Sequence, residues 1–250
     1  MKEIIEEVAS LFTQNNIPLF GIAKASSLET EPSGYKPSDM LASAKSILCL
    51  GIPVPKGIFK CQERSEWMYW RAANIFYRTI DAALTKTCGI TEAKDEVAVP
   101  IYGCFPYDIK GKGDFGGYLS LVRMGEATGI GKIGKNGLLF HSRWGPRLLL
   151  GGIVTTAALP KITWPETDEK GCPEDCFVCQ ERCPVKAIER SGKVDRVGCT
   201  RYSSRSPIFS NVMKTSHAES KDVQMMNHLT VVDDHSMYQC IKCVSVCPHM

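Results

Sequence analysis

Two short cysteine runs near the C-terminal end constrain this chain more than any other feature. The first is Cys172-Pro-Glu-Asp-Cys176-Phe-Val-Cys179-Gln-Glu-Arg-Cys183-Pro184, and the second is Cys240-Ile-Lys-Cys243-Val-Ser-Val-Cys247-Pro248. Cys199 stands between them, so this region carries eight cysteines. Closely spaced cysteines, a further cysteine three residues on and a following proline are typical of iron–sulfur ligation. Eight thiolates are enough for two 4Fe-4S clusters.

Zinc and disulfides are the alternative explanations for so many cysteines. The two-residue gap between Cys240 and Cys243 is common in zinc sites, but zinc sites rarely combine three-residue gaps with Cys-Pro endings in both runs. Disulfides are disfavoured in a reducing compartment. The pattern therefore favours clusters. One spacing departs from the usual run, because three residues separate Cys172 from Cys176. Either the turn bulges at Pro173 or Cys172 is not a ligand.

The remaining composition is that of an ordinary soluble protein, expected to be cytoplasmic and not bound to a membrane. Of 250 residues, 44% are apolar and 23% charged, and the net charge of +3 includes no basic block for nucleic acid or membrane. The N-terminal MKEIIEEVAS carries three glutamates, which argues against a signal peptide. The longest mostly apolar run, 148–159, is shorter than the about 20 residues of a membrane-spanning helix. The other cysteines are expected to be buried, inert thiols: Cys49, Cys61, Cys88 and Cys104.

Alternating strand and helix patterns predict an α/β domain over residues 1–165. Apolar residues three and four positions apart predict helices over 2–16 and 65–86, the second with Trp67, Ile75 and Ile80 on its apolar stripe. The near-continuous apolar run 46–54 predicts a strand buried on both faces. Shorter segments are expected to be strands at 19–23 and 97–102, a strand or hairpin at 147–158, irregular at 107–117, and helix or strand at 119–128.

The composition changes at residues 160–165, and residues 166–250 are predicted to form a ferredoxin-like module with two 4Fe-4S clusters. A short helix is expected after Pro184, and its Ile188 would cover a cluster from water. The expected fold class is thus α+β or α/β. It comprises an N-terminal α/β domain of the cofactor-binding kind and a ferredoxin-like module.

The cysteine pattern resembles the double-cluster domain of the epoxyqueuosine reductases, which are related to the corrinoid-dependent reductive dehalogenases. In that family a lone cysteine sixteen residues after the first Cys-Pro cysteine joins the second cluster, and Cys199 stands sixteen residues after Cys183. The resemblance implies crossed ligand sets. One cluster would be held by Cys172, Cys176, Cys179 and Cys247, and the other by Cys183, Cys199, Cys240 and Cys243.

The resemblance extends upstream, over about residues 115–250, through the stretch Gly129-Ile-Gly-Lys-Ile-Gly-Lys-Asn-Gly-Leu-Leu139. In the family the N-terminal domain binds cobalamin, so the resemblance implies cobalamin near this glycine loop. The stretch satisfies GxGxxG but lacks the helix and the acidic residue of a dinucleotide site. Its glycines indicate either a backbone close to a large ligand or a plain tight turn. The candidate cofactor-binding residues are Gly129, Gly131, Gly134, Lys135 and Gly137.

A general acid is a further requirement that the resemblance implies. The family uses an aspartate near the cobalt to protonate the departing oxygen, and a carboxyl suits this role when burial raises its pKa. Counted back from the glycine loop, that aspartate falls near Asp114, one residue out of register, and Asp108 is a second candidate. Either aspartate is also a natural turn-former in a glycine-rich loop.

Together these features predict an iron–sulfur oxidoreductase. Electrons from an external donor (a ferredoxin, a flavodoxin or a reductase) would pass through two clusters to cobalamin or to a small-molecule substrate on the N-terminal domain. The alternative is a non-catalytic, ferredoxin-type carrier that docks a redox partner. Many epoxyqueuosine reductases continue into a helical-repeat tail that helps to hold tRNA, whereas this sequence stops soon after Cys247. We therefore expect tRNA to be a disfavoured partner.

Overall fold

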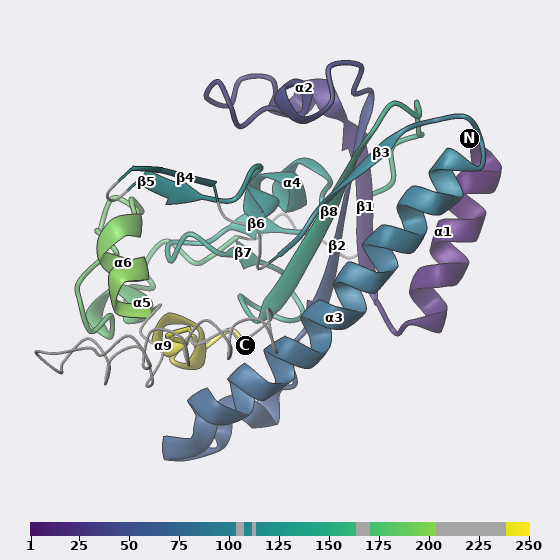
Figure 1. Cartoon of the computed structure of the whole chain (residues 1–250). Coiled ribbons are helices and arrows are strands. Elements are labelled where there is room, and N and C mark those ends of the chain that lie inside the picture. The colour runs from purple at the N-terminus through teal and green to yellow at the C-terminus, as the bar shows by residue number, and fades with distance from the viewer. Residues whose placement is uncertain (104–107, 112–113, 164–170, 204–238) are drawn as a thin grey trace, which may run out of the picture.

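A four-stranded antiparallel sheet of order β1-β2-β8-β3 forms the centre of the protein (Figure 1). The computed structural model describes residues 1–103, 108–111, 114–163, 171–203 and 239–250. The sheet consists of β1 (Leu19–Lys24), β2 (Ser46–Pro53), β3 (Ala98–Ile101) and β8 (Leu148–Thr155). All residues of β2 except Pro53 are buried, as its continuous apolar run predicted. The predicted mixed α/β class is confirmed in this coarse form.

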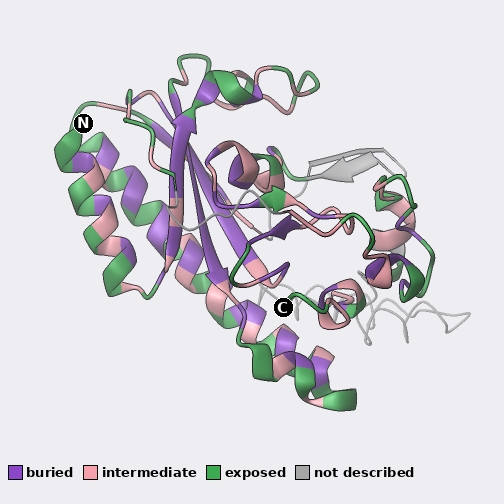
Figure 2. Ribbon diagram, turned by 180° about the vertical axis from the view of Figure 1, so that it is seen from behind, coloured by how far each residue is buried: buried purple, intermediate pink, exposed green. Residues whose placement is uncertain are grey.

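Helices cover both faces of this sheet. α1 (Lys2–Gln14) and α3 (Ser65–Glu92) lie on one face, and α4 (Leu121–Ala127) lies on the other (Figure 1). A buried apolar cluster fills each interface, with Ile80 on the α3 side and Met124 on the α4 side. In Figure 2 the strands are almost wholly buried, whereas both long helices alternate buried and exposed residues. The sheet is therefore the middle layer of three.

The apolar stripe of α3 differs from the prediction. Ile80 is buried, but Trp67 and Ile75 are 64% and 48% exposed. Tyr69 and Tyr77 occupy the core positions instead. Positions 69, 73, 77, 80 and 84 follow the helical repeat along one face, and Trp67 and Ile75 lie off that face. The helix also continues six residues beyond the predicted end at 86, to Glu92.

Short elements complete the α/β part: η1 (Ala25–Leu28), α2 (Pro37–Met40), η2 (Lys56–Lys60), η3 (Gln62–Arg64), β6 (Lys132–Ile133) and β7 (Leu139–Phe140). The ambiguous segment 119–128 is the helix α4, whose N-cap Ser120 accepts a hydrogen bond from the Arg123 N–H at 3.3 Å.

The expectation that residues 107–117 are irregular was wrong. β4 (Asp108–Gly111) pairs with β5 (Asp114–Gly116) as antiparallel strands, with a register shift between Ile109 and Gly111. The ladder uses backbone groups, which glycine retains, so a glycine-rich segment can still pair. The pairing is irregular at this register shift.

The C-terminal cysteine region contributes α5 (Val178–Glu181), α6 (Arg196–Ser203) and α9 (Lys242–Ser245), which gather beside one end of the sheet (Figure 1). The helix predicted after Pro184 was wrong. The Lys186 N–H donates to the Cys183 carbonyl at 3.2 Å, and Lys186 has a left-handed φ of 52°, which ends helical geometry. Ile188 then forms an isolated bridge with Val194.

Contacts tie the end of the chain to the α/β part. The Trp70 indole N–H donates to the Gln239 carbonyl at 2.9 Å, and the Lys56 ammonium donates to the Met250 carbonyl at 2.6 Å. Ile241 and Val244 join the apolar cluster on the α3 side of the sheet. The domain boundary predicted at residue 165 falls outside the described residues and stays a prediction. Within the part of the chain that is described, no helix has the length and apolarity to cross a membrane.

Candidate functional site

The seven cysteines of the two runs and Cys199 lie on and around α5, α6 and α9. Cys179 lies on α5, Cys199 on α6 and Cys243 on α9, and the other five lie on the adjoining turns. All eight are free thiols, and each is buried or half-buried. Residues more than 70 positions apart in sequence, from Cys172 to Cys247, thus share one region.

Electrostatic interactions sort these thiols into two groups. Burial raises the pKa of Cys179, and the thiols of Cys172 and Cys176 raise it further. Burial also raises the pKa of Cys247; the His249 backbone opposes this, and the thiols of Cys172, Cys176 and Cys179 add to it. Cys247 therefore lies with the first run, although its nearest cysteine in sequence is Cys243.

The second group is centred on Cys243. Burial, reinforced by the thiols of Cys199 and Cys240, and then those of Cys179 and Cys183, raises its pKa to about 12. The pKa of Cys199 is raised by burial and then by Cys183 and Cys240. Cys183 thus lies with the second run. The contribution of Cys179 to Cys243 indicates that the two groups are neighbours.

These groups have the composition of the two crossed ligand sets, while their role as ligands stays a prediction. The thiols are not arranged as the ligands of a single metal ion. Within the described ranges, no three His, Cys, Asp or Glu side chains are placed to hold one metal ion. A zinc ion draws its sulfur ligands to about 2.3 Å. A cluster is bound at its separate corners by cysteines from several points of the chain, so its thiols need not be mutual neighbours.

An apolar shell closes over the cysteines. Cys179, Cys183, Ala187 and Ile188 form one buried cluster, against which Val194 packs. The Ala187 N–H donates to the Cys183 sulfur at 3.3 Å. Ile188 is only 7% exposed and packs beside Cys179 and Cys183 from a turn rather than a helix, and its role in covering a cluster stays a prediction. Hydrogen bonds to sulfur and exclusion of solvent are two of the protein features that tune cluster potentials.

The glycine loop packs against the chain's own atoms. A Cβ on Gly131 would lie 2.4 Å from the Phe140 carbonyl oxygen, and one on Gly129 would lie 3.0 Å from the Thr163 side chain. Gly137 approaches Val194 in the same way, and Gly134 approaches Asn136. These contacts, and the positive φ of Gly129 and Gly137, explain the glycines as tight packing. Their role in binding a cofactor stays a prediction.

Lys135, the fifth candidate of that loop, is directed to the cysteine region. Its ammonium donates to the carbonyl oxygens of Pro173 and Cys176 at 2.8 and 3.0 Å, and to that of Glu174. Its Nζ also lies 4.3 Å from the centre of the Phe177 ring. The loop and the first cysteine run, predicted as separate sites, therefore meet through this side chain.

The two candidate acids lie on one hairpin. Asp108 begins β4 opposite Gly116, and Asp114 begins β5 opposite Gly111. Their side chains are outside the described part of the chain, so the acid role of either residue stays a prediction.

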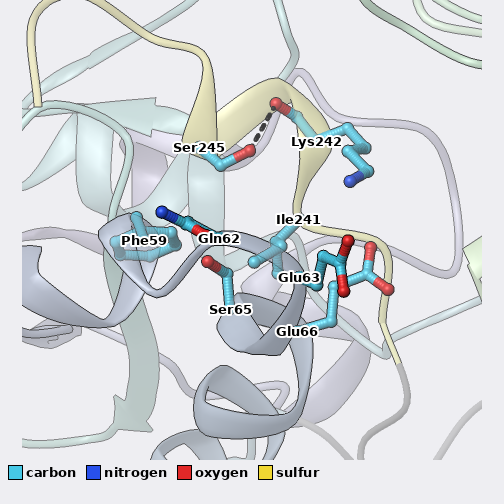
Figure 3. Close-up of a pocket in the computed structure, with 8 residues that line it drawn as sticks. All are labelled: Phe59, Gln62, Glu63, Ser65, Glu66, Ile241, Lys242 and Ser245. Atoms are coloured by element: carbon cyan, nitrogen blue, oxygen red, sulfur yellow. Dashed lines mark hydrogen bonds between the residues drawn. The ribbon is translucent and has the colours of Figure 1, made fainter.

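A polar cavity of about 170 Å³ lies where the start of α3 meets α9 (Figure 3). Its lining includes Glu63, Ser65 and Glu66 from the α3 side and Lys242 and Ser245 from α9. Binding sites for drug-sized molecules span about 300–1,000 Å³. This cavity is therefore too small for a corrinoid. None of the predicted cofactor-binding residues lines it.

His141, which follows β7, is completely buried. Its Nδ1 accepts the Arg143 N–H at 3.0 Å, which assigns the proton of the neutral ring to Nε2, and that atom has no partner in the described structure. Burial, and then the Arg143 charge, lowers the pKa of His141 to about 4, so the ring is neutral at neutral pH. A buried donor without an acceptor is destabilising. Only the tertiary structure reveals that His141 is buried and that its Nε2 has no partner among the described residues.

Fold and site together define an α/β protein with a group of eight buried or half-buried cysteines. Comparison with curated proteins finds an epoxyqueuosine reductase of Lactococcus garvieae that is 25% identical over the whole chain, which spans 70% of that protein. An epoxyqueuosine reductase of Prochlorococcus marinus is 28% identical over 49% of the chain and 34% of its own length. These matches confirm the predicted resemblance: the chain is related to the epoxyqueuosine reductases, which are enzymes. No protein-family profile matches it.

Solved structures show the same fold at lower identity. The epoxyqueuosine reductase of Streptococcus thermophilus matches with a TM-score of 0.58 and 16% identity, over 98% of this chain and 66% of the other. An epoxyqueuosine reductase bound to a tRNA stem loop matches at 0.60 and 15%, over 99% and 65%. A B12-dependent reductive dehalogenase matches at 0.53 and 13%, over 89% and 36%. The chain thus spans about two thirds of the solved reductases.

Proposed function

We propose that this chain is an iron–sulfur reductase that holds two 4Fe-4S clusters in crossed ligand sets. The observation that carries the proposal is the grouping of Cys247 with the first cysteine run and of Cys183 with Cys199 and Cys240. When bound, the clusters would supply one-electron transfer. The full-length match to reductases favours an enzyme over a non-catalytic carrier.

The chain's own residues give this centre its surroundings. Ile188 and Ala187 exclude water from the thiols, and the Ala187 N–H stabilises negative charge on the Cys183 sulfur. Ile241 and Val244 anchor the second run in the apolar cluster beside α3. A substrate or cofactor on the α/β side would therefore lie close to a fixed, partly shielded electron source.

The first prediction is that anaerobic reconstitution with iron and sulfide loads about eight irons per chain, the content of two 4Fe-4S clusters. The visible absorbance of the clusters should bleach on reduction. Metal analysis and optical spectra measure both quantities. A protein that takes up one or two tightly bound zinc ions and no iron would contradict the proposed function.

The binding of cobalamin is a further part of the proposal, and only the relatives support it. Because the polar cavity between α3 and α9, of about 170 Å³, is too small for a corrinoid, we derive no chemical step through cobalamin. We expect added cobalamin to give a bound, base-off absorption spectrum, measured by titration of the reconstituted protein. An unchanged cobalamin spectrum at high micromolar protein would remove the corrinoid from the proposal and leave the iron–sulfur centre standing. Asp114 stays the proposed acid.

The substrate class is the next part of the proposal. We favour a small molecule or cofactor, reduced with electrons from an external donor. A solved relative binds a tRNA stem loop, which keeps RNA as a second candidate. The exposed face of α3 supports that candidate, because Trp67 and Met68 are 64% and 49% exposed there and Arg64 and Arg71 are exposed beside them. Stacking aromatic groups and arginines is how proteins hold single-stranded RNA.

A further inference from the structure

Three backbone carbonyls of the first cysteine run converge on one ammonium group. Lys135 donates to the carbonyls of Pro173 and Cys176 at 2.8 and 3.0 Å, and to that of Glu174. A lysine ammonium has three N–H donors and no acceptor. All three donors of this half-buried side chain are therefore satisfied by a single five-residue loop, Cys172–Cys176.

The ring that follows this loop holds the same cation from another side. Lys135 Nζ lies 4.3 Å from the centre of the Phe177 ring, and the Arg190 guanidinium lies 5.6 Å from the same centre. A cation over an aromatic face is attracted by the negative charge of that face. Phe177 separates Cys176 from α5, so these contacts restrain the loop at the point where it enters the helix.

The unusual spacing of the first run explains why such a cation is present. The Cys176 N–H donates to the Pro173 carbonyl at 3.2 Å, so the extra residue is accommodated as a closed turn. A turn this tight directs several carbonyl dipoles to one side, where they repel one another unless a positive charge meets them. This turn is compatible with Cys172 as a ligand, whose role stays a prediction.

The geometry points to Lys135 as the positioning residue of the first cluster: it fixes the Cys172–Cys176 turn and adds a positive charge beside that ligand set. This inference rests on the proposed function for its cluster and on the observed contacts for its loop. A nearby positive charge stabilises the reduced state, which carries one more negative charge. Lys135 therefore raises the reduction potential of the first cluster relative to an uncharged residue.

The test compares Lys135→Met with Lys132→Met in the reconstituted full chain. Both changes remove one positive charge from the same glycine loop, but Lys132 is exposed and makes no such carbonyl contact with the described residues. In a potentiometric titration followed by electron paramagnetic resonance, we expect K135M to shift the one-electron equilibrium of one cluster about tenfold toward oxidation, about 59 mV. If K135M instead loses that cluster and retains about four irons, this result also supports the positioning role of Lys135. K132M should match the parent.

Two results distinguish a failure of this inference from a failure of the proposed function. If the parent protein loads both clusters and K135M retains the same iron and both potentials, Lys135 has no positioning role and the proposed function stands. If the parent protein takes up no iron, the proposed function fails together with the cluster part of this inference.

Amine labelling tests the loop contacts without a substitution, and it remains decisive if K135M does not fold. With limiting acetic anhydride and peptide mass spectrometry on the reconstituted protein, Lys132 should react about tenfold faster than Lys135, whose ammonium is held by charged hydrogen bonds. Equal reactivity of the two lysines would overturn the inference.

Discussion

Replacing Cys247 with alanine should abolish the cluster held by the first cysteine run and leave the cluster of its sequence neighbour Cys243 intact. The physical reason is proximity, because Cys247 lies among the thiols of Cys172, Cys176 and Cys179. Iron per chain should fall from about eight to about four. Iron analysis after anaerobic reconstitution measures this loss.

Double substitutions make the assignment decisive. Cys179→Ala combined with Cys247→Ala should lose no more iron than either change alone, because both remove the same cluster. Cys243→Ala combined with Cys247→Ala should lose nearly all of it. The matched control is Cys49→Ala, a buried thiol in β2 outside the centre, which should retain about eight irons. The reverse pattern, in which Cys243 and Cys247 act as one site, would rule out the crossed sets.

Replacing Gly21 with alanine should destabilise the fold by about 3 kcal/mol, the upper part of the usual range for overpacking. A Cβ at Gly21 would lie 2.4 Å from the Thr128 carbonyl oxygen and 3.2 Å from that of Ile162. Both are backbone atoms, so β1 would have to move away from the end of α4. Equilibrium urea unfolding followed by circular dichroism measures the change in the free energy of unfolding.

The matched control is Gly89→Ala in α3, where a Cβ has nothing within 4 Å. Alanine loses less backbone entropy than glycine in a helix, so this change should stabilise the protein by about 0.5–1 kcal/mol. Equal effects of the two substitutions would show that close approach at Gly21 does not limit stability.

Much of the α/β part could be predicted from apolar periodicity. The run 46–54 appears as the doubly buried β2, and the helix over 2–16 appears as α1. Trp67 and Ile75 were misplaced, since hydrophobicity alone does not specify which face of α3 meets the sheet. The 107–117 segment was misjudged because glycine content reports conformational freedom and not hydrogen-bond partners.

The amino-acid sequence by itself predicted the kind of centre, because ligand number and spacing are local properties of the two cysteine runs and cluster chemistry depends on both. It also indicated the family, through those same cysteines. Tertiary structure decided which thiols lie together and what surrounds them. Lys135 shows why: it lies 41 residues before Cys176, yet its ammonium bonds the carbonyl of that residue. No sequence pattern reports such a contact, since backbone carbonyls are common to every residue and only folding brings three of them around one charge.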